Sequence, residues 1–267
     1  MMKLEIYQVD SFTNEAFTGN PAGVCITEHP LDESLMFSIA AEIAVSETAF
    51  LSLNDFNLRW FTPEVEVNLC GHGTLAMAHI LKQKGLVAIG EGIVFETLSG
   101  PLEVTVGEHD IDMLFPTAEL EFDTLVNTVL LELLGLKLSD VVSYVQFGPK
   151  YLIEIRNEEI LRSLSPNFDG LNELEGRGVV VTAKSDFSHV DFVSRHFAPW
   201  VGINEDPVTG SAHCALAVYW AEKLNKVALK GFQASKRGGF VGVELMPNKK
   251  VKLTGSAITV IEGVIHV

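Results

Sequence analysis

Two segments of the chain follow nearly the same pattern, and one lies in each half of the sequence. They span residues 69–79 and 208–217, and each begins with a turn of small residues and continues in alanine and leucine. Lysines follow both segments and suit the C-terminus of a helix. Glycine at the start of such a helix lets a ligand approach the free backbone N–H groups. Each segment alone is typical of a buried helix behind a tight turn, but the pair favours two related modules whose helix N-termini bind one small carboxylate.

The spacing of apolar residues indicates an α/β chain. Short segments rich in β-branched and aromatic residues, typical of strands, alternate with segments of helical periodicity throughout the 267 residues. The periodicity predicts helices over residues 32–43, 123–134 and 188–197, each behind a capping side chain. In the last of these, Ser188 and Asp191 have the spacing of a capping box.

Charge is distributed unevenly between the two halves. The chain has 19 Lys and Arg against 35 Asp and Glu, a formal net charge of -16. Residues 1–133 carry 4 basic and 21 acidic side chains, whereas residues 134–267 carry 15 and 14. Nucleic acids and anionic membrane surfaces require cationic patches, so the balance excludes both as partners. Pro116, which directly follows a strand-like segment, is the expected joint between two domains.

The cysteines and the first residues indicate a cytoplasmic protein without a metal site. Cys25, Cys70 and Cys214 have no CxxC spacing, so neither a disulfide framework nor a zinc site is expected. His72 and His79 share one predicted helix, but no third ligand follows at a suitable spacing. The first ten residues lack the basic flank of a signal peptide, and no segment approaches the ~18 apolar residues of a membrane span.

Seven short motifs lie in order along most of the chain. They are residues 10–12 (DSF), 19–24 (GNPAGV), 46–50 (SETAF), 59–63 (RWFTP), 70–74 (CGHGT), 205–213 (EDPVTGSAH) and 237–239 (RGG). Together they resemble the phenazine-biosynthesis PhzF-like isomerase family, which is related to diaminopimelate epimerase and proline racemase. Residues 119–177 carry no motif that matches this family.

The resemblance implies a fold, an assembly and a kind of chemistry. The implied fold is α/β (α+β), with two pseudo-symmetric modules, each a curved, mostly antiparallel sheet or barrel around a central helix. The first module is expected at residues 1–116, with 254–267 returning to it, and the second at 117–253. The family also implies a homodimer in the cytoplasm that acts on a small carboxylate substrate without a metal or organic cofactor.

The resemblance assigns the catalytic roles to three residues. The glutamate of the family's Ser-Glu-Thr, here Glu47, takes a proton from a substrate carbon and returns it to another carbon on the same face. One carboxyl can do this if partial burial raises its pKa toward the working pH. Asp206 corresponds to a second acid that bonds a substrate amine or hydroxyl, and His72 to a donor or proton relay. Without the resemblance, Glu47 would be interpreted as a loop carboxylate and Asp206 as a turn-forming aspartate before Pro207. His72 would be interpreted as a histidine that bonds local backbone.

Five further residues complete the expected site as substrate-binding groups. Hydroxyl and backbone N–H groups suit a carboxylate ligand, although the same residue types also cap helices and form turns. These residues are Ser46, Cys70, Gly73, Gly210 and Ser211. No metal ligand is assigned.

Cys70 leaves a second reaction open. Thiol-dependent epimerases of this fold use two cysteines, one at the start of each paired helix. Cys70 has the first position, but Thr209 has the second, and a hydroxyl is far too weak an acid to replace a thiol. A symmetric two-thiol racemase is therefore disfavoured. An amino-acid racemase or epimerase that uses Cys70, and a non-catalytic binder of small carboxylates, remain as alternatives.

Overall fold

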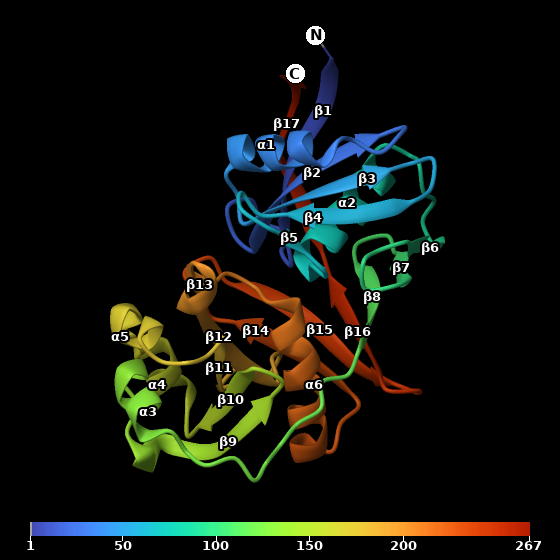
Figure 1. Ribbon diagram of the computed structural model, residues 1–267. Helices are drawn as coiled ribbons and strands as arrows, with labels where there is room; N and C mark the ends of the chain where they lie inside the picture. Colours follow the sequence, from blue (N-terminus) through green and yellow to red (C-terminus); the bar gives the residue numbers. More distant parts are fainter. Residues whose placement is uncertain (1) are drawn as a thin grey trace. The chain divides into compact units, whose positions relative to one another are not determined.

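The structure, a computed structural model, describes residues 2–267 (Figure 1). The chain divides into two compact units. Among these residues, the first comprises 2–115 with Lys252–Val267, and the second comprises Pro116–Val251. Within the described residues, no helix combines the length and the apolar character that crossing a membrane requires.

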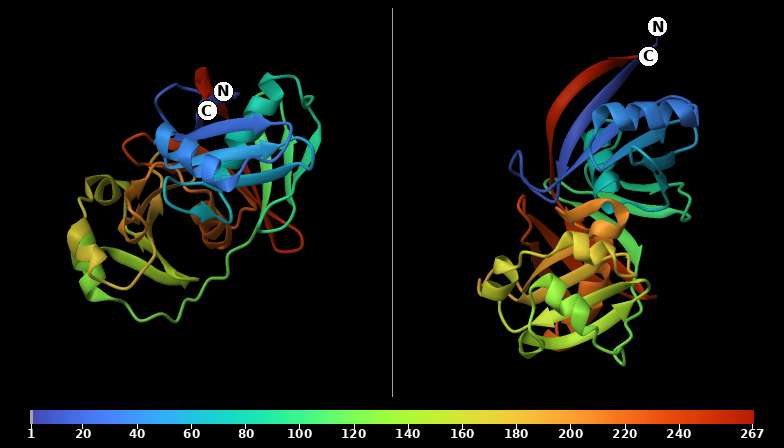
Figure 2. Two further views of the ribbon diagram at one scale, coloured as in Figure 1. Left: turned by 45° about the horizontal axis from the view of Figure 1, so that its top comes forward. Right: turned by 60° about the vertical axis from the view of Figure 1, so that its left-hand side comes forward.

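The first unit is built on a six-stranded sheet with the strand order β17-β1-β2-β3-β4-β5. The strands are β1 (Lys3–Ser11), β2 (Asn20–Thr27), β3 (Glu47–Ser52), β4 (Asn57–Phe61), β5 (Glu66–Val67) and β17 (Ala257–His266). β2 and β3 are parallel and are connected by α1 (Glu33–Ile43), whereas the other neighbours are antiparallel. β17 pairs with β1 from end to end, so the C-terminal strand completes the first unit (Figures 1 and 2).

The helix α2 (Gly71–Gln83) is the central helix of the first unit. It contacts β1, β2, β3 and β17, and nearly all of its residues from His72 to Leu81 are buried. A helix that is apolar on every side is expected inside a core rather than at the surface. The antiparallel strands β6 (Gly92–Phe95), β7 (Leu102–Val106) and β8 (Ile111–Pro116) follow α2, and β16 (Lys250–Gly255) neighbours β8.

The second unit contains a sheet with the order β15-β14-β12-β11-β10-β9, and β13 pairs with β12. Its strands are β9 (Val141–Phe147), β10 (Lys150–Ile155), β11 (Val179–Lys184), β12 (Phe192–Ala198), β13 (Ile203–Asp206), β14 (Ala228–Gln233) and β15 (Gly239–Met246). Its helices are α3 (Thr128–Leu134), α4 (Glu158–Ser163), α5 (Phe168–Asn172) and α6 (Gly210–Leu224), with single 3-10 turns at Leu138–Asp140 and Pro199–Val201. α6 packs on β14 and β15 and is buried along most of its length.

The two units repeat one order of strand pairings. In the first, β1 to β4 pair antiparallel, parallel and antiparallel in succession, and the short β5 and then α2 follow. In the second, β9 to β12 pair in the same succession, and the short β13 and then α6 follow. In both units a helical connection joins the two parallel strands, β2 to β3 in the first and β10 to β11 in the second. The predicted fold class, two pseudo-symmetric α/β modules, is confirmed.

The predicted helix over residues 188–197 is wrong. Phe192–Ala198 forms β12, which pairs with β11 on one side and β14 on the other. The capping-box spacing of Ser188 and Asp191 expresses only a local preference, whereas a central strand gains backbone hydrogen bonds from neighbours distant in sequence. Phe192, Val193 and Phe197 are fully or almost fully buried in that strand.

The other two helix predictions differ in accuracy at their N-termini. α1 begins behind Asp32, whose side chain accepts from the Ser34 N–H as expected of an N-cap. α3 begins later than predicted, because Asn127 rather than Asp123 caps it and accepts from the Leu130 N–H at 3.0 Å. It ends at Gly135, as expected for a residue that adopts a left-handed φ of 80°.

Candidate active site

The sequence CGHG at residues 70–73 shapes the N-terminus of α2. Cys70 is the N-cap residue, with φ −139° and ψ 106°, and its Sγ accepts a hydrogen bond from the Gly73 N–H at 3.4 Å. The Thr74 hydroxyl donates to the backbone oxygen of Cys70 at 2.7 Å. A Cβ at position 73 would lie 2.8 Å from Cδ1 of Trp60, so glycine lets the first turn pack closely on this buried indole.

Three predicted site residues of the first unit meet at this N-terminus. Glu47 is the first residue of β3, and its Oε2 lies 3.2 Å from Nε2 of His72. The Sγ of Cys70 lies 3.5 Å from Nδ1 and 3.9 Å from Nε2 of the same ring. The Glu47 side chain is 16% exposed and the His72 side chain 8%. Glu47 is therefore the more accessible partner, and the imidazole lies behind it.

Two serines hold His72 in position. The Ser11 hydroxyl, at the end of β1, donates to the backbone oxygen of His72 at 2.8 Å. The Oγ of Ser46 lies 3.3 Å from Nε2 of the His72 ring, which is the nitrogen that also contacts Glu47. Ser46 was predicted as a site residue, whereas Ser11 lies in the DSF motif without an assigned role.

The electrostatics of the cluster couple the charge of His72 to the charges of Cys70 and Glu47. Burial raises the pKa of Cys70, and His72 only partly offsets this. Burial alone would lower the pKa of His72, but the negative charge that Cys70 and Glu47 can carry more than offsets the desolvation and places that pKa well above its usual value. Negative charge on Glu47 or Cys70 therefore favours the protonated His72 ring.

The second unit has a polar cluster at the N-terminus of α6. Thr209 is the N-cap residue, and its hydroxyl donates to Oδ2 of Asp206 at 2.5 Å and lies 2.9 Å from Nδ1 of His196. Gln233 donates to the backbone oxygen of Asp206 at 2.7 Å and accepts from the Thr209 N–H at 2.9 Å. His196 and Gln233 are buried, and burial lowers the pKa of His196. Together they fix the end of β13, where Asp206 lies, and the turn that leads to α6.

Lys150 adds a cation to this cluster. Its Nζ donates to the Ser211 hydroxyl at 3.2 Å. Burial lowers the pKa of Lys150, and the charge of Asp206 partly offsets this effect. Ser211 is exposed and Gly210, the first residue of α6, is buried. An exposed hydroxyl beside an ammonium group at a helix N-terminus is suited to an anionic ligand.

The predicted site residues fall into two groups, one in each unit. Ser46, Glu47, Cys70, His72 and Gly73 lie together in the first, and Asp206, Gly210 and Ser211 lie together in the second. Sequence reasoning assigned no role to Ser11, Lys150, His196 or Gln233, which contact these residues. Only Ser11 had a sequence signal, its place in a motif, because the other three belong to strands without a matching motif.

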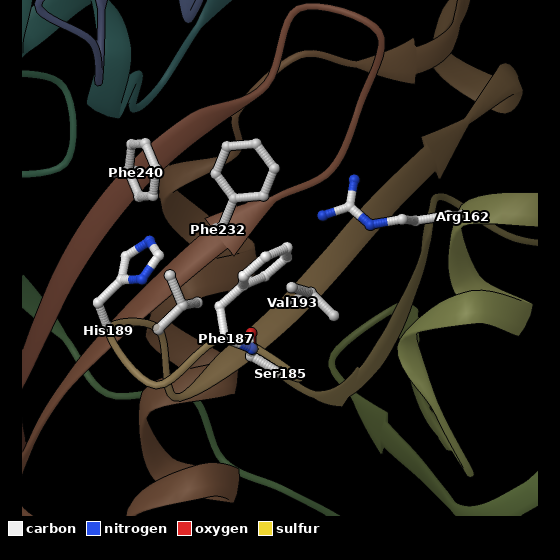
Figure 3. Close-up of a pocket in the computed structure, with 8 residues that line it drawn as sticks. Arg162, Ser185, Phe187, His189, Val193, Phe232 and Phe240 are labelled. Atoms are coloured by element: carbon white, nitrogen blue, oxygen red, sulfur yellow. Dashed lines mark hydrogen bonds between the residues drawn. The ribbon is translucent and has the colours of Figure 1, made fainter.

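A hollow in the second unit is separate from both groups. It has a volume of about 240 Å³ and is lined mainly by apolar and aromatic side chains (Figure 3). Phe187, Phe232 and Phe240 surround it, and Arg162 extends toward it from α4. None of the predicted site residues lines this hollow.

Comparison with known proteins identifies relatives over the whole length. The family model described as phenazine biosynthesis-like protein matches residues 9–263. An uncharacterized isomerase of Halalkalibacterium halodurans is 45% identical over 265 residues, which cover 98% of both chains. The human phenazine biosynthesis-like domain-containing protein is 39% identical over 286 residues, which cover 98% of this chain and 99% of the human one.

Solved structures agree with this relationship. The crystal structure of a PhzF family phenazine biosynthesis protein from Enterococcus faecalis has a TM-score of 0.92 and 39% identity, with 100% of both chains covered. A hydroxyproline epimerase from Agrobacterium vitis, crystallised with bound trans-4-OH-L-proline, has a TM-score of 0.64 at 10% identity over 98% of this chain and 92% of its own. The second likeness is one of fold alone.

The fold and the relatives define the class of this protein as an isomerase with the epimerase-like fold. Within that class the chain belongs to the PhzF-like, phenazine biosynthesis-like family. The family resemblance of the seven motifs is thereby confirmed.

Proposed function

We propose that this protein is a cofactor-independent isomerase that moves a proton on a small carboxylate substrate, with Glu47 as the acid and base. The observation that carries the proposal is the 3.2 Å contact between Oε2 of Glu47 and Nε2 of His72 at the N-terminus of α2. The carboxylate is partly exposed and can meet a ligand, while a buried imidazole holds it in one orientation. A positioned carboxylate is a sufficient group for proton transfer at carbon.

Each part of the proposed step has a group that can perform it. Oε2 of Glu47 takes a proton from an acidic C–H of the substrate, and the same carboxyl returns it to a neighbouring carbon. His72 donates a hydrogen bond to Glu47 and keeps the carboxyl in the rotamer that faces the substrate. The positive end of the α2 dipole, with its backbone N–H groups, stabilises the negative charge that develops on the substrate.

The polar cluster of the second unit also has groups that suit a small carboxylate with an amine or hydroxyl. Asp206, held by Thr209 and Gln233, would accept a hydrogen bond from a substrate amine or hydroxyl. Ser211, Gly210 and the nearby Lys150 would bind a carboxylate through hydroxyl, backbone N–H and ammonium groups. These roles predict that Asp206→Asn and Ser211→Ala weaken substrate binding.

A second candidate is a racemase or epimerase in which Cys70 carries the proton. The 3.5 Å distance between Sγ of Cys70 and Nδ1 of His72 favours it, since a histidine can take the proton of an adjacent thiol. Burial, which raises the pKa of Cys70, opposes it. Cys70→Ser separates the two candidates: a racemase loses its activity, whereas Glu47-dependent proton transfer survives.

The experiment that tests the proposal is hydrogen exchange at substrate carbon. The protein is incubated in D2O with small carboxylates that have an acidic C–H, and the incorporation of deuterium is measured by mass spectrometry and NMR. The proposal predicts exchange into at least one of them. Calorimetric binding of such carboxylates with no exchange into any of them would instead identify a non-catalytic binder.

Two further properties belong to this proposal. We expect a homodimer, which light scattering coupled to gel filtration would detect as twice the mass of one chain. We also expect a cytoplasmic protein, because Cys25, Cys70 and Cys214 are all free and buried, as is usual in a reducing compartment. Cell fractionation tests the location.

A further inference from the structure

The cluster at the N-terminus of α2 contains three different metal-ligating groups. Glu47, Cys70 and His72 each offer one ligand atom, and these atoms all lie within 4.8 Å of one another. Among the described residues, no other group of three or more histidine, cysteine and acidic side chains is close enough to hold one ion. A thiolate, an imidazole and a carboxylate are the ligand types that zinc binds in proteins. The spacing of residues along the sequence conceals the set, because Glu47 comes from a strand.

Two of the three distances between ligand atoms are close to those around a tetrahedral ion. Zinc bonds of 2.0–2.3 Å at tetrahedral angles place neighbouring ligand atoms about 3.3–3.6 Å apart. Nε2 of His72 lies 3.2 Å from Oε2 of Glu47 and 3.9 Å from Sγ of Cys70. One imidazole nitrogen can therefore share an ion with both partners once the ligand atoms of Glu47 and Cys70, which lie within 4.8 Å of each other, move closer together.

The surroundings suit a bound cation with one open position. Cys70 and His72 are buried, so the protein holds the thiol and imidazole ligands away from bulk water. Glu47 is partly exposed, which leaves a direction from which water or a ligand can reach the ion. Three protein ligands and one open position are the arrangement of zinc sites that exchange their fourth ligand.

We propose that Glu47, Cys70 and His72 bind Zn²⁺ and that the bound ion inhibits the enzyme reversibly. On binding, the Cys70 thiol and the His72 imidazolium release their protons to solvent, and bonds from sulfur, nitrogen and oxygen to the ion replace the hydrogen bonds of the cluster. The inhibition rests on the proposed function, because the ion occupies the Glu47 oxygen that takes the substrate proton. The binding of Zn²⁺ does not depend on the proposed function.

The decisive experiment uses Co²⁺ as a spectroscopic probe for Zn²⁺. The protein without substrate is titrated with Co²⁺ under reducing conditions, and the thiolate-to-cobalt charge-transfer band is recorded in the near ultraviolet. We expect a band that saturates at one equivalent and disappears when Zn²⁺ displaces Co²⁺. Cys70→Ser, which keeps a capping oxygen, should lose the band, and His72→Asn should weaken Zn²⁺ binding by about tenfold or more.

Cys214→Ser is the matched control, because Cys214 is also free and buried but lies outside the cluster. It should keep the band of the wild type. Absence of a band in the wild type, or its persistence in Cys70→Ser, would overturn the proposal. Exchange assays are then run with and without Zn²⁺ and with a chelator added afterwards. Suppose that Co²⁺ binds at Cys70 but Zn²⁺ does not slow deuterium exchange into the substrate. The metal site would then be established, and the role of Glu47 in catalysis, with the proposed inhibition, would be contradicted.

Discussion

Nε2 of His72 lies 3.2 Å from Oε2 of Glu47, although Glu47 begins a strand and His72 lies in the first turn of a helix. The two side chains meet because β2, the neighbour of β3 in the sheet, packs directly on α2, and β3 itself contacts that helix. Burial lowers the pKa of His72, but the negative charge that Cys70 and Glu47 can carry outweighs burial and raises that pKa well above its usual value. The pair therefore links the fold of the first unit to the chemistry that we propose for it.

Replacement of His72 by asparagine tests its role as a positioning residue. The variant keeps a hydrogen-bond donor but loses the imidazolium beside Glu47, so we expect solvent exchange into substrate to fall about 10- to 100-fold. The pH profile of exchange should change shape as well, because the titrating ring is gone. His79→Asn is the control in the same helix, where the ring contacts Thr259 instead. Equal loss of exchange in both variants would contradict a specific role for His72.

Gln233 is predicted to stabilise the turn between Asp206, the last residue of β13, and α6. It is fully buried and bonds both the Asp206 backbone oxygen and the Thr209 N–H. Gln233→Leu leaves two buried polar groups without their partner, which should lower the free energy of unfolding by about 2–4 kcal/mol. Gln146→Leu, at a residue whose side chain bonds only an exposed carbonyl, should change it by less than about 0.5 kcal/mol. Urea unfolding of the two variants measures the difference, and similar values would contradict the prediction.

Gly231 marks a close contact in the core of the second unit. A Cβ there would lie 2.5 Å from the ring of Phe192, which is fully buried and stacked on Trp220. Gly231→Ala should therefore destabilise the protein by about 1–3 kcal/mol, because the ring cannot move without repacking. Gly263→Ala is the matched control in a strand, since nothing lies within 4 Å of a Cβ at that position. Thermal unfolding of both variants tests the prediction, and equal transition temperatures would refute it.

His213 should make stability fall under acidic conditions. Burial lowers the pKa of His213 to about 4, whereas the unfolded chain binds this proton near pH 6.5. Between these two pH values the unfolded state binds more protons than the folded state. The contribution of His213 to the free energy of unfolding is therefore complete above about pH 6.5 and falls toward pH 4, by about 3 kcal/mol at most. Urea unfolding at several pH values should show a smaller acid loss in His213→Asn. The same slope in both proteins would contradict the buried neutral histidine.

The elements with a clear local pattern were predictable, and those stabilised by distant partners were not. Asp32 caps α1, and Gly135 ends α3, as the sequence indicates, because caps depend on residues a few positions away. β12 was predicted as a helix because its pairing with β11 and β14 does not appear in the local sequence. Secondary structure of a central strand is decided by tertiary contacts.

The sequence indicated which residues could form the candidate site, but not which of them contact one another. The motifs indicated Glu47, Cys70 and His72, but not that one imidazole contacts both the carboxylate and the thiol. His196 and Gln233 come from β12 and β14 and reach the turn after Asp206 only because the chain folds them beside it. The residue types and sequence spacing of His196 and Gln233 do not indicate a functional role. Buried polar residues of this kind are recognised only by the groups that they bond in the folded protein.

The rate of deuterium exchange in Glu47→Gln tests the central claim most directly. Glutamine keeps the shape of the side chain but cannot take a proton, so exchange into a carboxylate that the wild type deuterates should fall about 10²- to 10⁴-fold. Calorimetric affinity for that carboxylate should stay close to the wild-type value. Glu64→Gln, at an exposed glutamate of the same unit, should exchange normally. Exchange by Glu47→Gln at the wild-type rate would contradict the account.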